Sequence, residues 1–481
     1  MALSKWKIKN TGIEFSYCNK TNRLFEADGS LMMFPPEWKS QYDHQEVEQT
    51  SKKTNTPFAL RIALGHACNY DCSYCFQKDI GNPSERPQNK SLDTFIQNLK
   101  DNLDLSELQR VELWGGEPFL YWNDIVPIMK FLDRPGLTFY ISTNGSTLHD
   151  KHVEFFNQLE SLVTIGISHD GPAQKEQRGE EIFDIERVKR VLKKIDDSYP
   201  HVQVGFNSVV TRQNYDLFKM NTFFKKVVED LDLNHIVVGF NIARSYKEVI
   251  EVDHHYSFDD DAVLSGRELS EFNLIFKKYL EEQKHQYVEH NEKVASGVES
   301  KYGCRDSNLI PSHYFTSSGS NSVIGFLKSL IHSIPIVGHT NCGSDNAKVL
   351  SLDIEGSVRT CPHTGPKYIG GKLTKLEDAR AINLNFARKT GHCDTCPNLK
   401  LCKSSCPIDL PKEVFLLNCG VEKIWYHQIQ KTALSILFNS DVELLSSLYG
   451  PYGEYDHDYE PVSKSMFPNQ LSKEVLDELI G

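Results

Sequence analysis

The sequence lacks any long uninterrupted hydrophobic run. Its N-terminus, MALSKWKIKN, has no apolar signal core, and the most apolar later stretch, residues 322–338, is interrupted by Lys328, His332 and Pro335. These absences predict a soluble cytoplasmic protein that does not cross a membrane. Disulfides are rare in that compartment, so clustered cysteines are expected to be metal ligands or redox-active thiols.

The sequence also lacks an excess of positive charge and any internal repeat at solenoid periods. Its formal net charge of -12 argues against a nucleic-acid partner bound through a broad basic surface, although an acidic protein can recruit a basic peptide. The 481 residues, 39% of them hydrophobic and 11% aromatic, suffice for two or three domains with packed cores. We therefore expect a globular protein.

The cysteines of the sequence are clustered: ten of the 12 fall into two blocks. The first block is Cys68, Cys72 and Cys75, a C-x3-C-x2-C run inside HACNYDCSYCF. Three thiolates on one loop can hold three irons of a cubane cluster and leave the fourth iron without a protein ligand. Zinc is the alternative, but it usually takes four protein ligands from paired C-x2-C units.

From Phe58 to about Arg244, short β-branched runs alternate with helical patterns, which predicts an α/β fold with a parallel sheet. Segments rich in Gly, Asn, Asp or Cys (GHACNYDC, GGEP, TNG and HDGP) follow most of the strands. In βα barrels the loops after the strands form the active site, so we expect these segments to converge at one mouth. The six expected strands are Phe58 to Leu64, Arg110 to Trp114, Thr138 to Ser142, Val163 to Ser168, Val202 to Val210 and His235 to Asn241.

The chain is expected to divide into five parts. They are an N-terminal extension with a hairpin (1–55), a core of βα units (56–244), a linker or insert (245–340), a second cysteine module (341–425) and a C-terminal helical extension and tail (426–481). We expect helices over residues 270–289 and up to Leu437. Cys18 is predicted to be a half-buried strand residue of the hairpin, and Cys304 lies in the insert.

With a strand before it and the aromatic Phe76 after it, the first cysteine loop resembles the cluster loop of the radical S-adenosylmethionine (SAM) enzymes. LWGGEP at residues 113–118 and STNG at residues 142–145 resemble further segments of that family. The resemblance implies a partial (β/α)6 TIM-like barrel and a catalytic 4Fe-4S cluster on Cys68, Cys72 and Cys75. It also implies that SAM binds at the open iron.

The resemblance further implies which residues contact SAM. In the GGEP segment, Gly115 and Gly116 permit close backbone approach, and Glu117 accepts a hydrogen bond from the amino group of SAM. The segments after the third and fourth strands line the ribose and the carboxylate, and Arg178 pairs with the carboxylate. Without the resemblance, each feature on its own would be interpreted as an ordinary structural one: a tight turn, hydroxyl groups at strand ends and a solvated cation. The other implied contacts are Phe76, Ser142, Asn144, Ser168, Asp170 and Asn207.

The second block resembles the seven-cysteine SPASM extension, a C-terminal module that carries two auxiliary 4Fe-4S clusters. The resemblance implies an outer cluster on Cys393, Cys396, Cys402 and Cys419, and an inner cluster on Cys342, Cys361 and Cys406. The fourth ligand of the inner cluster stays open: a more distant cysteine such as Cys304, a substrate group, or none. A zinc ribbon on residues 393, 396, 402 and 406 is the alternative, and it leaves the other three cysteines unexplained.

The implied cofactors are therefore SAM and three 4Fe-4S clusters, and the implied activity is oxidative modification of a ribosomally synthesised peptide through a 5′-deoxyadenosyl radical. Carbon-carbon or thioether cross-linking of side chains is favoured. Formylglycine formation in a sulfatase is the alternative, but Pro362 stands where sulfatase-maturating members have an aspartate. An iron-sulfur electron carrier or zinc-stabilised scaffold is the alternative of another class, and it would not need the strand-end motifs to meet.

The expected partners are a precursor peptide and an external electron donor of flavodoxin or ferredoxin type. The stretch before Cys68 is too short for a complete winged-helix domain that binds a leader peptide. Leader recognition is therefore expected to use a separate binding protein or the N-terminal extension.

Overall fold

The chain forms two compact units in the computed structural model. Unit 1 comprises residues 1–48, 265–341 and 384–481, and unit 2 comprises residues 49–264 and 342–383. Each unit is described by itself. The structure describes residues 3–19, 21–34, 52–75, 77, 92–233, 237–243, 264, 266–295, 322–331, 343–360, 369–379, 393, 396–403 and 412–446.

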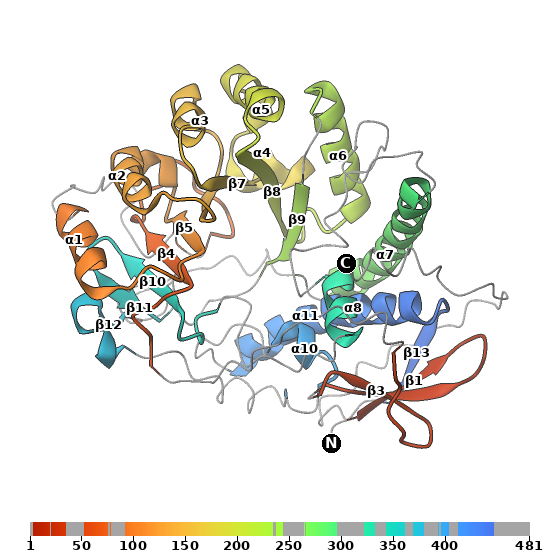
Figure 1. Ribbon diagram of the computed structural model, residues 1–481. Helices are drawn as coiled ribbons and strands as arrows, with labels where there is room; N and C mark the ends of the chain where they lie inside the picture. The colour runs from red at the N-terminus through yellow and green to blue at the C-terminus, as the bar shows by residue number, and fades with distance from the viewer. Residues whose placement is uncertain are drawn as a thin grey trace. The chain divides into compact units, whose positions relative to one another are not determined.

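Unit 2 contains a nine-stranded sheet in which six strands, from β4 to the edge strand β9, are parallel and adjacent in chain order (Figure 1). All six predicted strands are present, with ends shifted by at most a few residues. The sheet therefore confirms the mixed α/β fold. The six strands are β4 (Ala59–Ala63), β5 (Arg110–Trp114), β6 (Thr138–Thr143), β7 (Leu162–Ser168), β8 (Val202–Val210) and β9 (Val237–Ile242).

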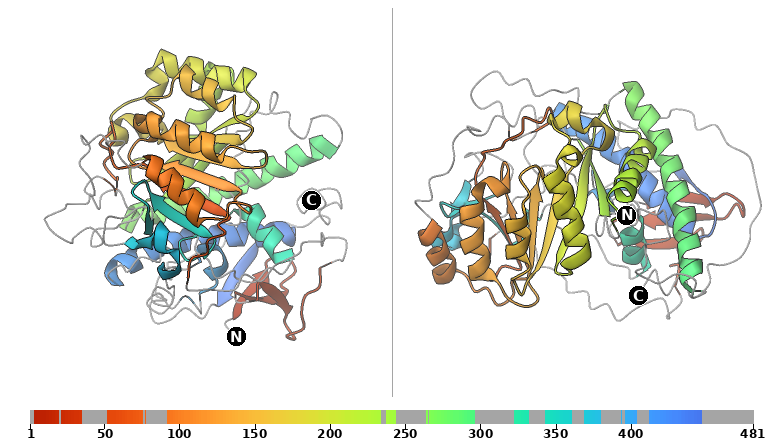
Figure 2. Two further views of the ribbon diagram at one scale, coloured as in Figure 1. Left: turned by 60° about the vertical axis from the view of Figure 1, so that its left-hand side comes forward. Right: turned by 90° about the horizontal axis from the view of Figure 1, so that it is seen from above.

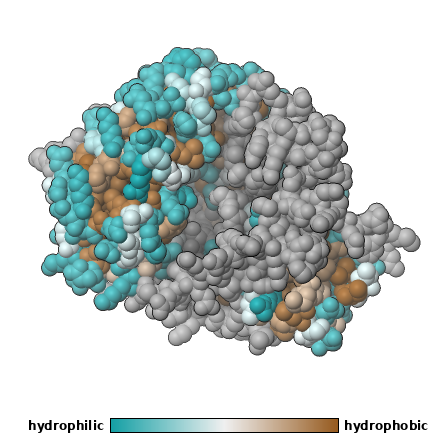
Figure 3. All heavy atoms as spheres, viewed as in Figure 1, coloured by the Kyte–Doolittle hydropathy of each residue, from teal (hydrophilic) through white to brown (hydrophobic). Residues whose placement is uncertain are grey.

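Helices between these strands cover one face of the sheet (Figure 2). Their amphipathic patterns explain this placement: in α5, Val188, Val191, Leu192 and Ile195 are buried at helical spacing, and every other position except the last is charged. In the space-filling view, hydrophilic side chains dominate the surface over these helices (Figure 3). The helices are α1 (Leu92–Asn102), α2 (Trp122–Leu132), α3 (Asp150–Phe156), α4 (Gln174–Arg178), α5 (Glu186–Ser198) and α6 (Leu217–Asp230).

The sheet continues beyond β4 through strands that sequence reasoning did not expect there. β10 (Val349–Asp353) pairs in parallel with β4, and β11 (Ser357–Arg359) and β12 (Ile369–Lys372) extend the sheet antiparallel. We predicted one module over residues 341–425, whereas the two compact units separate within it at residue 383. The all-buried strand β10 explains the difference, because it covers an edge of β4 that would otherwise lack a partner.

Unit 1 combines a four-stranded antiparallel sheet with helices. The predicted N-terminal hairpin is present as β2 (Glu14–Cys18) and β3 (Arg23–Glu26), and β1 (Leu3–Ile8) joins β2 to the unpredicted strand β13 (Val442–Ser446). The predicted helix over residues 270–289 lies within α7, and the helix predicted up to Leu437 ends there. The helices are α7 (Gly266–Ala295), α8 (Val323–Ile331), α10 (Leu399–Cys402) and α11 (Lys412–Leu437).

Aromatic side chains bind the sheet of unit 1 to its helices. The ring centroid of Trp6 lies 5.7 Å from that of His427, and the centroid of Phe15 lies 4.7 Å from that of Phe438. Cys18 is in a strand as predicted, but it is fully buried rather than half-buried. Among the described helices, none has both the length and the apolar composition that crossing a membrane requires.

Candidate functional site

The loop that carries Cys68 is bound to the GGEP segment through backbone hydrogen bonds. The amide of Gly116 donates to the carbonyl of Gly65 (2.9 Å), and the amide of Glu117 donates to the carbonyl of Ala67 (2.8 Å). A Cβ atom on Gly115 would overlap the Gly65 carbonyl oxygen, and one on Gly116 would overlap the Ala67 carbonyl oxygen. The two glycines therefore permit close backbone approach, as predicted, but the backbone that approaches them is that of the cysteine loop.

A second set of contacts joins the cysteine loop to the segment after β6. The side-chain amide of Asn144 donates to Oδ1 of Asn69 (2.9 Å), and the side-chain amide of Asn69 donates to Oγ of Ser146 (2.8 Å). Oδ1 of Asn144 accepts a hydrogen bond from the amide of Ser146 (2.9 Å). Asn144, predicted as a cofactor contact, thus holds two loops of the mouth together.

Glu117 is a completely buried carboxylate at the centre of these contacts. It accepts hydrogen bonds from Oγ1 of Thr143 (2.7 Å), the amide of Asn144 (2.7 Å) and the amide of Phe119 (3.1 Å). Burial raises the pKa of Glu117, while these bonds lower it. Within the described ranges it forms no ion pair with Lys, Arg or His. A buried carboxylate without a cationic partner fits the ammonium group of a ligand such as SAM.

The three thiols of the first cysteine block lie close enough to influence one another. Burial raises the pKa of Cys72 to about 12; Arg178 lowers this pKa, and the Cys75 and Cys68 thiols raise it. Burial is also the main cause of the raised pKa of Cys68. Neutral, converging thiols can release their protons to an incoming metal, so the donor set fits an iron-sulfur cluster.

No three His, Cys, Asp or Glu side chains in the described part of the chain converge tightly enough to hold a single metal ion. Phe76, the predicted aromatic contact, lies outside the described residues.

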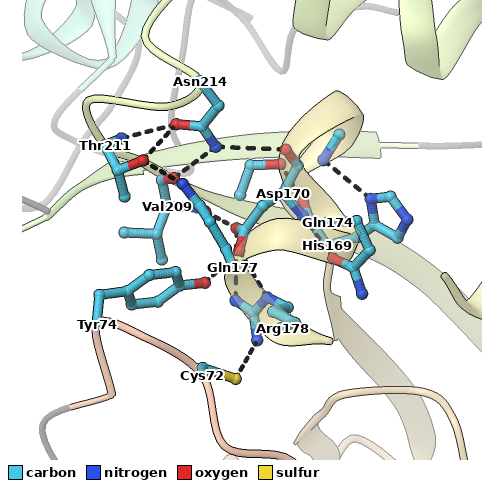
Figure 4. Close-up of polar contacts among 12 residues, drawn as sticks. Cys72, Tyr74, His169, Asp170, Gln174, Gln177, Arg178, Val209, Thr211 and Asn214 are labelled. Carbon is cyan, nitrogen blue, oxygen red and sulfur yellow. Dashed lines mark hydrogen bonds and ion pairs between the residues drawn. The ribbon is translucent and has the colours of Figure 1, made fainter. Parts of the chain in front are cut away.

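Arg178 and Asp170 form a buried ion pair beside Cys72 (Figure 4). Nε of Arg178 donates to Oδ2 of Asp170 (2.7 Å), and Nη1 of Arg178 lies 3.8 Å from the sulfur of Cys72. Asp170 also accepts hydrogen bonds from the Tyr74 hydroxyl and from the amide of Val209 (3.0 Å). Both residues are predicted cofactor contacts, and in this structure Asp170 contacts Arg178, Tyr74 and Val209.

Residues that sequence reasoning missed complete this network. The carbonyl of Gln177 accepts a hydrogen bond from the amide of Ser73 (2.9 Å), and the side-chain amide of Asn214 donates to the carbonyl of Asp170 (3.3 Å). The side-chain amide of Gln177 donates to the Thr211 hydroxyl. The position of Tyr74 between two predicted ligands was the available signal for that residue, whereas the other contacts arise from loops distant in sequence.

Ser142, Ser168 and Asn207 lie near the ends of β6, β7 and β8 and are half-buried. Ser168 is paired in register with Asn207, whose side-chain amide donates to the Tyr140 hydroxyl (2.9 Å). Gly166 lies in β7, between Tyr140 on β6 and Asn207 on β8, and a Cβ atom on Gly166 would overlap the Tyr140 hydroxyl. The three predicted residues therefore share the face of the sheet opposite its fully buried side chains.

The four cysteines predicted to hold the outer cluster, Cys393, Cys396, Cys402 and Cys419, lie in unit 1. Burial raises the pKa values of Cys396, Cys402 and Cys419, and the Cys402 thiol is influenced by the thiols of Cys393, Cys396 and Cys419. The four predicted outer-cluster ligands are thus near enough for the charge of one thiolate to affect the pKa of another. The Cys402 thiol also donates to Oε2 of Glu422 (3.3 Å). Cys304, Cys342, Cys361 and Cys406 lie outside the described residues.

The N-terminal hairpin supports this second set. The side-chain amide of Asn19 donates to the carbonyl of Cys396 (2.7 Å), although 377 residues separate them in sequence. On the other side, the side-chain amide of Gln430 donates to the carbonyl of Pro397 (3.3 Å). The loop that bears Cys396 is therefore held by hydrogen bonds from the N-terminal hairpin and from α11.

Comparison with known proteins identifies the central part of unit 2. Residues 62–219 match the model of the Radical SAM superfamily, so this part of the chain is a Radical SAM superfamily domain. A domain of this superfamily implies SAM and a 4Fe-4S cluster as cofactors. The match includes the cysteine loop and all the loops described around it.

Three similar proteins illustrate the range of relatives. The radical SAM cyclopropyl synthase TigE of Paramaledivibacter caminithermalis is 24% identical over 309 residues, which cover 56% of this chain and 63% of that protein. A GTP 3′,8-cyclase of Clostridium perfringens is 25% identical over 63% of this chain and 80% of the cyclase. Native anSMEcpe with bound AdoMet and Kp18Cys peptide superposes with a TM-score of 0.51 at 16% identity, covering 79% of this chain and 99% of that one. This last likeness shows the fold.

Proposed function

We propose that the protein is a radical SAM maturase that oxidatively modifies a ribosomally synthesised peptide by cross-linking its side chains. The observation that supports it best is the mouth of unit 2, where the loop with three buried or half-buried thiols is bound to the segment that carries a buried acid, Glu117. No described cation pairs with this acid. A protein with the same fold, anSMEcpe, has been solved with both AdoMet and a peptide. That structure favours a peptide substrate for this chain.

In this proposal, Cys68, Cys72 and Cys75 hold the 4Fe-4S cluster, Glu117 takes the amino group of SAM, and Arg178 takes its carboxylate. The bound cluster and SAM supply a 5′-deoxyadenosyl radical that abstracts a hydrogen from the substrate. The chain keeps Glu117 out of water and holds the loops together. Both effects favour a fixed orientation of the cofactor and a dry site.

We assign the second cysteine set to a SPASM-type module. Cys393, Cys396, Cys402 and Cys419 hold the outer auxiliary cluster, and Cys342, Cys361 and Cys406 hold the inner one. When bound, these clusters would supply an acceptor for the one electron that is left after a hydrogen atom and a proton have been removed from the substrate. The proposal requires an external electron donor of flavodoxin or ferredoxin type, and a leader peptide bound by the N-terminal extension or by a separate protein.

A nucleotide is the second candidate substrate. The match to GTP 3′,8-cyclase covers 80% of that enzyme, a larger share than the match to TigE covers of TigE. The half-buried polar residues at the ends of β6 to β8 can bind a small polar molecule as well as a peptide. The two candidates differ in the product that each predicts.

Anaerobic reconstitution, iron counting and an assay for 5′-deoxyadenosine test the proposed cofactor chemistry. We expect the wild type to cleave SAM when reduced, and Cys72→Ala to abolish cleavage and to lose about four irons. Cys18→Ala is the matched control, because Cys18 is a buried thiol that is not a predicted ligand. Unchanged cleavage in Cys72→Ala would rule out the proposed catalytic cluster.

Mass spectrometry tests the substrate. A precursor peptide encoded beside this gene should lose two hydrogens for each cross-link when it is co-expressed with the protein. An unchanged peptide mass, together with conversion of GTP by the reconstituted protein, would instead favour the nucleotide candidate.

A further inference from the structure

Arg178 is committed to two partners on the protein. Its guanidinium donates through Nε to Asp170 (2.7 Å) and points Nη1 at the sulfur of Cys72 (3.8 Å). Its Cζ atom also lies 5.3 Å from the centre of the Tyr74 ring. The Arg178 side chain is 8% exposed, so water does not screen its charge as it would at the surface.

Asp170 has no exposed surface with which to meet a ligand. Its carboxylate receives hydrogen bonds from Arg178, from the Tyr74 hydroxyl and from the amide of Val209. These donors come from α4, the cysteine loop and β8, so Asp170 fixes Arg178 relative to both the sheet and the loop (Figure 4). Asp170 is therefore a positioning residue that acts through Arg178.

The distance between Arg178 and Cys72 is also fixed by the backbone. The amide of Ser73 donates to the carbonyl of Gln177 (2.9 Å), which ties the residue after Cys72 to the residue before Arg178. α4 ends directly after Arg178 at Gly179, whose φ of 88° stops the helix in the left-handed conformation. The cation and the sulfur are thus held together by main-chain and side-chain bonds.

We propose that Arg178, positioned by Asp170, donates a charged hydrogen bond to the sulfur of Cys72 and raises the reduction potential of the cluster bound there. One-electron reduction adds a negative charge to the cluster, and a buried cation beside a ligand sulfur stabilises that charge. This role is distinct from pairing with the carboxylate of SAM. The inference rests on the proposed cluster at Cys68, Cys72 and Cys75.

A redox titration by electron paramagnetic resonance on the reconstituted full chain, without SAM, tests this role. The signal of Cys68→Ala/Cys72→Ala/Cys75→Ala is subtracted, so that only the first cluster is followed. For Arg178→Gln we expect unchanged iron content. The equilibrium constant for reduction should be at least about tenfold lower, which corresponds to a decrease in reduction potential of about 59 mV for one electron. Arg178→Lys keeps the positive charge, so its reduction potential should stay close to that of the wild type. Asp170→Asn should lower the reduction potential.

The matched control is Arg190→Gln, because Arg190 pairs with Asp150 at the surface of unit 2 and is 62% exposed. It should leave the potential unchanged. If Arg178→Gln weakens SAM binding in calorimetry but keeps the wild-type potential, the inference is wrong and only the carboxylate role remains. If the triple cysteine variant keeps all its iron, the proposed cluster itself is wrong, which is a separate failure.

Discussion

The two cysteine sets differ in how their loops are supported. Cys68, Cys72 and Cys75 lie within eight residues of one another in sequence, and their loop is held by the segments that follow neighbouring strands of one sheet. The described cysteines of the second set are spread over residues 393–419, and an N-terminal hairpin supports them. The first site thus depends on the regular βα pattern, whereas the second depends on contacts between distant parts of the chain.

Single cysteine substitutions should have the largest effects, and these effects should differ between the two cysteine sets. Cys402→Ala removes a predicted cluster ligand of the second set, so we expect loss of about four irons and of peptide product, with formation of 5′-deoxyadenosine retained. Cys72→Ala should remove both activities. Loss of SAM cleavage in Cys402→Ala, measured at equal protein concentration, would show that the first site depends on the second.

Trp6→Ala should have the next largest effect, because it removes a fully buried indole that stacks on His427. We expect a loss of about 3–5 kcal/mol from the unfolding free energy of unit 1, measured by urea denaturation, and lower iron content in the second set only. Leu274→Ala is the control, since Leu274 is 67% exposed and should change stability by less than about 0.5 kcal/mol. Full iron content after loss of Trp6 would argue against support by the hairpin.

Acid should destabilise unit 1 through His427. Burial lowers the pKa of His427 to about 4, against an unfolded value of about 6.5. Its stabilising contribution is therefore complete above pH 6.5 and is lost as the pH falls through 4, with a total on the order of 3 kcal/mol. Urea denaturation between pH 7 and pH 4.5 should show a shallower decline for His427→Gln than for the wild type. Identical slopes would contradict the assignment.

Asn19→Ala should have the smallest effect. It removes the hydrogen bond to the Cys396 carbonyl, which predicts a loss of about 1 kcal/mol and faster release of iron from the second set to a chelator. Thr11→Ala, at the exposed turn between β1 and β2, is the control. Equal iron release from both variants would show that the Asn19 contact does not stabilise the loop.

Much of unit 2 could be predicted from the sequence because its information is local. Most of its parallel strands are short apolar runs closely followed by Gly, Asn or Asp, and parallel strands place such ends at one edge. The residues that meet there were therefore predictable, but their partners were not. Glu117 was assigned to a ligand and also holds three protein donors, and Asp170 was assigned to the cofactor and holds Arg178.

The sequence by itself determined the parallel sheet, the cysteine loop and the hairpin, since each follows from residue types at short spacing. Only the tertiary structure decided that β10 extends the sheet, that β13 completes the sheet of unit 1, and that Asn19 supports Cys396. These contacts join segments far apart in the chain. They form because open sheet edges and buried carbonyl groups require hydrogen-bond partners. The spacing of residues along the sequence does not indicate which distant segment supplies the partner.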